Sequence, residues 1–368
     1  MLSVLYYFSN IQTNMFQWQK YHFMDELAEH DCHFEIISPL DYGSIEEANE
    51  VLLKSIQEKQ YDIFMTSYNE DYLEYDTIKA IKNAGVATLL FCPDNLVVPY
   101  NHKHIARYFD LVWLTSKETQ YLFNRWKAKS IFLPYAANPH FLVPYSHDYE
   151  ELRVGFIGTP HGSRISAINS FVDNGIPVTI HTSNTSTSNI GLRAKPVSYI
   201  KVLSRELRYP IGWKLAAAQI IDKLQKNAIH SNSPFYMLEP PVALRELAAL
   251  NSKYALTLSF TNANSTGVLK HPVKIVNLRN FELPMSGAIQ FCEYSHEMAE
   301  YFEDDKEIVM YRNAEEAIDK ANYYLDPSKD MIRKNIREAA RLRAERDHTW
   351  FNRFNRVFTE FGLQNHVR

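Results

Sequence analysis

The amino-acid sequence predicts an α/β protein with two domains. Its 368 residues are enough to build two domains with sizeable cores. The first part of the chain alternates strand-length apolar runs with segments of helical periodicity, which is typical of a parallel sheet covered by helices. After a polar linker at residues 145–151, a new strand, turn and helix begin. We therefore place a first domain at residues 1–145, a second at 152–348 and a final helix within 349–368.

The elements of the first domain follow from local patterns. Phe16, Tyr21, Met24 and Leu27 share one face of a predicted helix, and Ser44 can cap the next helix. The predicted strands are residues 3–8, 34–38, 63–66, 87–92, 110–115 and 130–133, and the predicted helices are residues 14–29, 45–59, 75–83 and 117–126.

The second domain has fewer clear elements. Asn313 and Glu316 have the spacing of a capping box at the start of a helix. The other predicted elements are strands at residues 153–158, 254–260 and 288–291, and helices at 165–173, 244–250, 331–347 and 351–361.

The stretch from His271 to Glu293 should form a helix, a tight turn and a short buried strand. Pro272 suits the first helical turn, where its missing N–H is not needed. Pro284 and Gly287 are expected to stop the helix before the strand at residues 288–291.

Charged side chains give this stretch a candidate binding role. Lys274 and Arg279 lie near the N-terminal half of the expected helix, where free N–H groups attract phosphate. Glu282, further along, could hold two vicinal hydroxyl groups such as those of a ribose. Together they suit a nucleotide-sugar diphosphate, and the alternative is a surface helix with ordinary ion pairs.

Composition excludes several classes of protein. The net charge of −4 gives no global attraction to nucleic acid, so no nucleic-acid partner is expected. Neither a secretion signal nor an apolar run of membrane-spanning length is evident. Cys32, Cys92 and Cys292 lie in apolar segments without metal-ligand spacing, as expected of reduced core residues in a cytoplasmic protein.

Ligands bind open α/β sheets at the carboxyl ends of the strands. This rule singles out residues 9–10, 66–67 and Asp94, which follows a buried strand. Asp94 could act as a general base on an acceptor hydroxyl, or it could only cap a turn. His102 and His104 are weaker candidates for the catalytic role. Their H-x-H spacing can hold a metal ion, but no third ligand lies nearby in the sequence, so we expect a surface loop.

A family resemblance connects these features. The order N-L-R-N-F-E-L-P-M-S-G-A, then a short strand, then H-E-M-A-E-Y-F-E-D-D-K-E-I-V-M-Y resembles the group 1 glycosyltransferases, and most of all their spore-maturation-protein (CgeB-like) branch. The phrases A-T-L-L-F-C-P-D-N and I-F-L-P-Y-A-A-N-P-H-F in the first domain resemble the same family. The resemblance implies a GT-B fold, in which two Rossmann-like domains face each other across a cleft.

The resemblance also implies roles for particular residues. The donor would bind the second domain, with its ribose on Glu282 and its diphosphate near Arg164, Lys274 and Arg279. Members of the family commonly have two glutamates separated by seven residues, and Lys274 replaces the first of them here. The turn G-T-P-H-G-S-R at the end of the strand at 153–158 resembles the family's diphosphate loop, so Gly158 and Thr159 are further donor-binding candidates. Gly287, in the stretch from His271 to Glu293, is another.

The implied activity is transfer of a sugar from a nucleotide-sugar donor to a glycan, a lipid-linked molecule or another hydroxyl acceptor, as in polysaccharide biosynthesis. No cofactor or metal is expected, because the chain has no D-x-D triplet and the fold uses positive protein groups instead. The final helix would pack back on the first domain. The alternatives are a sugar-nucleotide epimerase and a non-catalytic nucleotide-sugar-binding protein of the same architecture.

Residues 191–234 form a basic insertion relative to the family. Trp213, Leu215, Ile220, Ile221 and Leu224 predict one apolar helical face within it. A basic amphipathic stretch can lie on an anionic membrane or hold an acidic acceptor. The alternative is a pair of docked helices whose basic face is solvated. The basic residues are Arg193, Lys195, Lys201, Arg205, Arg208, Lys214, Lys223 and Lys226.

Overall fold

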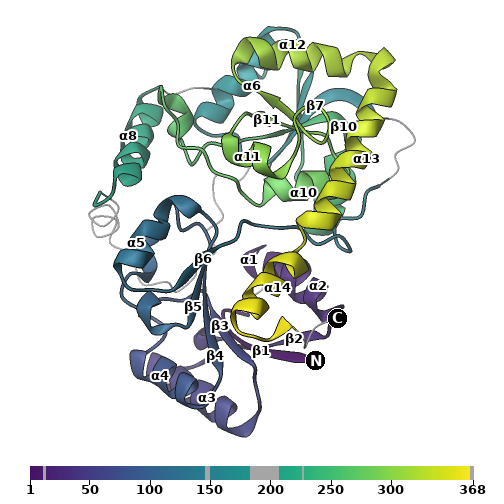
Figure 1. The fold of residues 1–368 in the computed structure, drawn as a ribbon. Coiled ribbons are helices and arrows are strands. Elements are labelled where there is room, and N and C mark those ends of the chain that lie inside the picture. Colours follow the sequence, from purple (N-terminus) through teal and green to yellow (C-terminus); the bar gives the residue numbers. More distant parts are fainter. Residues whose placement is uncertain (11–13, 146–149, 183–206, 226–227, 365–368) are drawn as a thin grey trace. The chain divides into compact units, whose positions relative to one another are not determined.

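The computed structural model describes residues 1–10, 14–145, 150–182, 207–225 and 228–364. The chain divides into two compact units. The first contains Met1–Asn138 and Thr349–Arg368, and the second contains Pro139–His348. Each unit is built on a six-stranded parallel sheet with helices packed on it (Figure 1).

The first sheet has the strand order β2-β1-β3-β4-β5-β6. Its core is formed by buried side chains such as Phe64, Leu90 and Val112. The strands are β1 (Leu2–Tyr7), β2 (Cys32–Ile37), β3 (Ile63–Thr66), β4 (Ala87–Cys92), β5 (Leu111–Leu114) and β6 (Ser130–Phe132). The main helices are α1 (Asn14–Gln19), α2 (Asp25–Ala28), α3 (Ile45–Glu58), α4 (Tyr75–Asn83), α5 (Gln120–Arg125) and α14 (Trp350–Glu360).

The second sheet has the order β12-β11-β10-β7-β8-β9. Helix α12 packs on β7, β10 and β12 beside α6, whereas α9, α10 and α13 pack together. The strands are β7 (Glu151–Ile157), β8 (Val178–His181), β9 (Tyr236–Glu239), β10 (Tyr254–Ser259), β11 (Gln290–Glu293) and β12 (Val309–Tyr311). The helices are α6 (Ser163–Asp173), α8 (Pro210–Gln225), α9 (Leu247–Lys253), α10 (Arg279–Met285), α11 (His296–Tyr301), α12 (Ala314–Leu325) and α13 (Asp330–Asp347).

Two helix caps confirm their sequence predictions. Ser44 Oγ accepts a hydrogen bond from the N–H of Glu47 at 3.1 Å, at the start of α3. Asn313 Oδ1 accepts from the N–H of Glu316 at 2.9 Å, and Glu316 Oε2 accepts from the N–H of Arg312 at 2.8 Å. Short polar side chains satisfy the free N–H groups of a first helical turn, which is why they locate helix starts in the sequence.

The first predicted helix, at residues 14–29, is interrupted. A π-helical turn at Lys20–Met24 separates α1 from α2. The wider turn shifts the helical periodicity, so Phe23 is fully buried while Tyr21 is only half-buried. Tyr21, which was predicted to face inward, is therefore less buried than Phe16 and Leu27.

The stretch from His271 to Glu293 also differs from its prediction. Residues 271–278 are not helical, because Ile275 N–H bonds to the carbonyl of Thr261 and Lys274 forms an antiparallel bridge with Asn262. Helix α10 begins only at Arg279, and Pro284 lies inside it. Gly287, with a φ of +69°, ends the helix as predicted.

Helix α14 belongs to the first unit although it comes last in the sequence. Its Trp350 ring packs edge-on against Phe23, with ring centroids 5.5 Å apart. Glu26, on α2, accepts hydrogen bonds from the N–H groups of Trp350 and Phe351 at 3.2 and 2.9 Å. Arg353 Nε donates to the carbonyl of Pro134 at 3.1 Å. These contacts complete the core of the first unit with a distant part of the chain.

Candidate nucleotide-binding site

The second sheet reverses its strand order between β7 and β10. Strand β7 is the first strand of the unit and pairs with β8 on one side and with β10 on the other. In open α/β sheets a crevice forms outside the carboxyl ends of the strands at such a point. The loops that follow β7 and β10 are therefore the first place to look for a ligand site.

The loop after β7 holds two glycines in conformations that other residues rarely adopt. Gly158 has a φ of +147°, and its N–H bonds to the carbonyl of His181 at 2.9 Å. Gly162, with a φ of +61°, is the N-cap of α6. A Cβ at Gly162 would lie 3.0 Å from Ser265 Oγ and 3.1 Å from Asp222 Oδ2. The loop thus brings the start of α6, which begins two residues earlier than predicted, close to the loop after β10. Thr159 is exposed in this loop.

Arg164, in the first turn of α6, is brought close to Arg279. Its guanidinium lies over the ring of Phe260, 5.5 Å from the centroid, and Nη1 donates to the carbonyl of Thr159 at 3.3 Å. Burial lowers the pKa of Arg164, and the charge of Arg279 lowers it further. No carboxylate in the described part of the chain forms an ion pair with Arg164. Two guanidinium groups close together in this way favour a bound anion.

Glu282 is the carboxylate beside this pair. It is buried, and its Oε2 lies 3.3 Å from Nη1 of Arg279 without a hydrogen bond between them. Nη1 of Arg279 is buried and has no hydrogen-bond partner among the described residues. Because a buried donor without a partner is costly, this guanidinium nitrogen is suited to a ligand acceptor.

Two asparagines attach the start of α10 to the end of β10. Asn277 Nδ2 donates to the carbonyl of Phe260 and Asn280 Nδ2 donates to Ser259 Oγ, both at 3.1 Å. The N–H of Arg279 bonds to Asn277 Oδ1 at 3.0 Å. The sequence analysis did not single out these asparagines. Their i, i+3 spacing just before a helix is the signal that could have found them, because Asx side chains bond nearby backbone groups.

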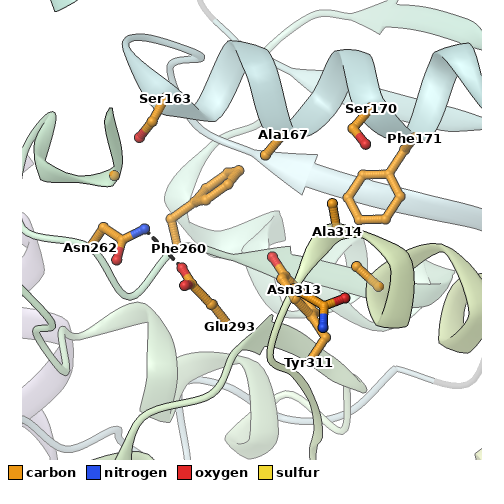
Figure 2. Close-up of a pocket in the computed structure, with 12 residues that line it drawn as sticks. Ser163, Ala167, Ser170, Phe171, Phe260, Asn262, Glu293, Tyr311, Asn313 and Ala314 are labelled. Carbon is orange, nitrogen blue, oxygen red and sulfur yellow. Dashed lines mark hydrogen bonds between the residues drawn. The ribbon is translucent and has the colours of Figure 1, made fainter. Parts of the chain in front are cut away.

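A cavity of about 190 Å³ adjoins this cluster at the carboxyl ends of β10, β11 and β12 (Figure 2). Phe260 connects the charged cluster to the cavity, because the guanidinium of Arg164 lies over its ring and the residue also lines the cavity. Figure 2 shows Asn262 and Glu293 facing each other on one side of the cavity and Asn313 on another. The polar lining residues are Ser163, Ser170, Asn262, Glu293, Tyr311 and Asn313.

Lys274 forms an ion pair and a hydrogen bond with two residues that line this cavity. Its Nζ lies 2.6 Å from Glu293 Oε2 and donates to Asn262 Oδ1 at 2.9 Å. Asn262 Nδ2 donates to the same Glu293 oxygen at 3.0 Å. The charge of Lys274 is therefore balanced by a carboxylate, unlike that of Arg164. Glu293 was not predicted, although a carboxylate directly after a buried strand is a recognisable signal.

Gly287 lies apart from the guanidinium pair, at the other end of α10. A Cβ there would lie 3.1 Å from Cβ of Pro144. Its carbonyl accepts a hydrogen bond from Arg337 Nη1 at 3.2 Å. Gly287 therefore ends α10 and packs against Pro144 and Arg337. It does not contact Gly158, Thr159 or Arg164.

Asp94 lies in the first unit, in the turn after β4. It is exposed and has a φ of +53°. Its Oδ1 accepts a hydrogen bond from the Tyr135 hydroxyl at 2.9 Å, and its N–H donates to that hydroxyl at 3.2 Å. Burial, followed by the charge of Asp94, raises the pKa of Tyr135 well above its ordinary value. Asp94 is thus held in a turn while its carboxylate stays accessible.

The two candidate histidines, His102 and His104, differ in burial. His102 is buried, and its Nε2 lies 3.0 Å from the carbonyl oxygen of Ser67, so the expectation of a surface loop was wrong for this residue. Burial lowers the pKa of His102 and keeps its ring neutral. His104 is exposed, as expected. The three cysteines are free and buried, as predicted.

Neither a metal cluster nor a membrane span is found in the described ranges. No group of three or more His, Cys, Asp or Glu side chains there is arranged to hold a metal ion. No helix within those ranges is long and apolar enough to cross a membrane.

The paired parallel sheets define the class of fold, which is GT-B. A glycosyltransferase from Rickettsia africae superposes with a TM-score of 0.58 at 12% identity, covering 98% of this chain and 97% of that chain. HepE from Anabaena, in complex with UDP and glucose, superposes with a TM-score of 0.56 at 10% identity over 98% and 99% of the two chains. Sucrose-phosphate synthase from Thermosynechococcus elongatus gives a TM-score of 0.54 at 12% identity, with 98% and 99% covered. The prediction of the fold class is confirmed.

The sequence itself matches one family model. Residues 218–359 match the family described as "Glycosyl transferase-like", and this segment includes Lys274, Arg279, Glu282 and Glu293. Arg164 lies outside the matched segment. A search of curated proteins finds no significant match.

Proposed function

We propose that this protein is a glycosyltransferase that uses a nucleotide-sugar donor. The observation that carries the proposal is that Arg164 lies over Phe260 within electrostatic range of Arg279, which in turn lies 3.3 Å from the buried carboxylate of Glu282. These groups lie at the ends of β7 and β10, where α/β sheets of this topology bind ligands. The match of residues 218–359 to a glycosyltransferase-like family supports the same function.

The chemistry of a donor diphosphate fits these side chains. The two guanidinium groups would bind its phosphate oxygens, and the N-terminal end of the α6 dipole would add partial positive charge. Glu282 would accept hydrogen bonds from the ribose hydroxyls. Because negative charge develops on the leaving diphosphate during transfer, the same cations would stabilise the transition state in place of a metal ion.

We propose a uridine diphosphate sugar as the first donor to test. HepE, which shares the fold, is described in complex with UDP and with UDP-glucose. A glycan or lipid-linked hydroxyl is the proposed acceptor, and we assign the protein to the CgeB-like branch and to cytoplasmic polysaccharide biosynthesis. Asp94, whose carboxylate is accessible, is the proposed general base for the acceptor hydroxyl.

One observation favours a second candidate function. Lys274 replaces a motif glutamate and is neutralised by Glu293, so position 274 offers no carboxylate to a donor sugar. A sugar-nucleotide epimerase, or a binding protein without catalysis, would be consistent with this substitution. Transfer that depends on an added acceptor distinguishes the three, because an epimerase changes the sugar without an acceptor and a binding protein changes nothing.

The test is a thermal-shift panel of UDP-, GDP-, ADP- and CDP-sugars, each with and without Mg²⁺. A ligand that binds only the folded state raises the melting temperature. We expect a UDP-sugar to stabilise the protein without metal, and Arg279→Gln to abolish the shift. Arg346→Gln is the matched control, because Arg346 is exposed on α13 of the same unit, pairs with Asp347 and does not line the cavity. A panel without any shift would contradict the proposal.

A further inference from the structure

Helix α8 exposes an apolar stripe that none of the described residues covers. Trp213, Ile220 and Leu224 are 61%, 63% and 76% exposed, and they recur at helical spacing along one side of the helix. The side of α8 that faces the protein contains the buried residues Leu215 and Ala218. Of the five residues predicted to form one apolar face, only Leu215 is buried, and on a helical projection it falls opposite Trp213.

The charges of α8 are arranged around this stripe. On a helical projection, with 100° between successive residues, Lys214 and Lys223 fall on opposite flanks of the stripe. Both are exposed, and neither forms an ion pair within the described ranges. Asp222 is the single carboxylate of this helix, and it faces the protein, where its Oδ2 accepts a hydrogen bond from Ser265 Oγ at 2.9 Å.

The contact at Asp222 also fixes the orientation of the helix. Ser265 belongs to the loop between β10 and α10, and a Cβ at Gly162 would touch both Ser265 and Asp222. With this side held against the protein, the stripe must point outward. Figure 1 shows α8 at the periphery of the second unit, away from its sheet.

We propose that α8 binds an anionic lipid surface, with Trp213, Ile220 and Leu224 inserted at the interface and Lys214 and Lys223 against the headgroups. An interfacial helix buries its apolar face about 5–10 Å deep and is strengthened by anionic lipid. Lysine stems can extend along the apolar boundary while their ammonium groups reach the headgroups. The inference rests on α8 itself and holds whatever the donor of the proposed reaction is.

Charge complementarity selects lipid over the other occupants of such a stripe. A second copy of this chain would bring the same lysines face to face, which like charges disfavour. An acidic polysaccharide would use the lysines and leave the apolar side chains in water. An anionic membrane satisfies both features at once.

The binding test uses the full-length protein and two kinds of vesicle, phosphatidylcholine alone and phosphatidylcholine with about 30 mol % phosphatidylglycerol. Each lysine near an anionic surface contributes about a fivefold gain in affinity. We expect flotation with the anionic vesicles, weakened by about 0.5 M NaCl through screening. Lys214→Glu with Lys223→Glu should weaken binding at least 25-fold, since about fivefold is lost per lysine before repulsion is added. Lys54→Glu with Lys79→Glu, on exposed helices of the first unit, is the charge-matched control.

The apolar part is tested separately. Trp213→Ser, Ile220→Ser and Leu224→Ser combined should reduce vesicle binding by more than about tenfold, because each removes apolar area from the interface. The control is Met331→Ser with Leu342→Ser, which are 62% and 66% exposed on α13 of the same unit. All five positions are exposed, so unchanged melting temperatures should accompany the variants.

Tryptophan fluorescence supplies an independent readout. Emission should shift to shorter wavelength on anionic vesicles in the wild-type protein, and the shift should disappear in Trp213→Phe while flotation persists. Absence of flotation, equal flotation with both vesicle types, or full binding by the triple serine variant would overturn the proposal. Concentration-dependent dimers that the triple variant abolishes would identify a second copy as the occupant instead. Polysaccharide binding without a Trp213 shift would identify an acidic glycan.

Discussion

Arg164 and Arg279 come from elements more than a hundred residues apart, yet the folded chain brings them within electrostatic range of each other. Burial lowers the pKa of Arg164, and the positive charge of Arg279 lowers it further. Glu282 balances part of this charge from the first turn of α10. Among the described residues, the buried Nη1 of Arg279 has no hydrogen-bond partner, and a phosphate oxygen would satisfy it.

The first prediction concerns Glu282. Glu282→Gln should weaken nucleotide binding at least tenfold, because the amide cannot accept charge-assisted hydrogen bonds from two ribose hydroxyls. Calorimetric titration with UDP measures the loss. Glu316→Gln, at a capping position of α12 in the same unit, serves as the control and should bind normally. An unchanged affinity for Glu282→Gln would remove the ribose assignment.

Asp94 gives the second prediction. Asp94→Asn should slow sugar transfer by roughly 10²-fold, the lower range for loss of a general base, and leave donor binding intact. Asparagine also tolerates a positive φ, so the turn should survive. Tyr135→Phe is the comparison, because it removes the hydrogen bond to Asp94 and keeps the carboxylate. Full activity in Asp94→Asn would show that the residue serves only the turn.

At the scale of elements, helix ends decide most of the local structure. Ser44 and Asn313 start α3 and α12 at the residues that the sequence indicates. Helix α10 is shorter than predicted because residues 271–278 bond to the loop after β10 rather than to themselves. Competition of this kind is not visible in the sequence, since it depends on what lies beside the segment.

Gly287 provides the third prediction. Gly287→Ala should lower the melting temperature by more than Gly85→Ala, which has a similar φ of +83° but no atom within 4 Å of the added Cβ. The positive φ costs both variants about 1 kcal/mol, and only Gly287→Ala adds a close contact with Pro144. Nucleotide affinity should be unchanged. A loss of nucleotide affinity without a loss of stability would support a role for Gly287 in donor binding.

The fourth prediction concerns the attachment of α14. Burial raises the pKa of Glu26 to about 7 from an ordinary value of 4.5, while the N–H groups of Phe351 and Trp350 lower it less strongly. The folded state therefore holds a proton that the unfolded state releases earlier. This contribution to stability is complete below about pH 4.5 and is lost as the pH rises through about 7, amounting to roughly 3 kcal/mol.

Glu26→Gln should remove this pH dependence, because the amide does not titrate. Its single oxygen can accept only one of the two backbone hydrogen bonds, so we also expect a loss of stability that is the same at every pH. Thermal melts of the wild type and the variant between pH 5 and pH 8 measure the difference. Glu29→Gln, one turn further on and exposed, is the control. A difference between wild type and variant that does not change with pH would contradict the assignment.

At the scale of the whole molecule, the two units should unfold as separate transitions. All of the proposed donor-binding residues lie in Pro139–His348, whereas Trp350 completes the core of the first unit. Bound UDP should raise one calorimetric transition and leave the other unchanged. Trp350→Ala should lower the other transition, since removal of a buried aromatic side chain typically costs about 3–5 kcal/mol. A single transition that both perturbations shift equally would contradict this division.

The fold class could be read from the sequence because hydrophobic periodicity is local. Strands β3 and β4 and helix α4 lie at the residues their patterns predict. Strand β8 and the edge strand β9 were not predicted, and β9 has largely exposed residues that give no strong apolar pattern. In the candidate site, Arg164, Arg279 and Glu282 were identified, but Asn277, Asn280 and Glu293 were not, since amide groups and single carboxylates are common on surfaces.

The sequence by itself therefore determined the alternation of strands and helices, the helix starts at Ser44 and Asn313, and the charged residues available for a diphosphate. The tertiary structure decided which of those residues meet. It brought Arg164 within electrostatic range of Arg279, paired Lys274 with Glu293, placed Gly287 against Pro144 and turned the apolar side of α8 outward. The physical reason is that periodicity and capping act within a few residues, whereas ion pairing and burial depend on neighbours that only the folded chain brings together.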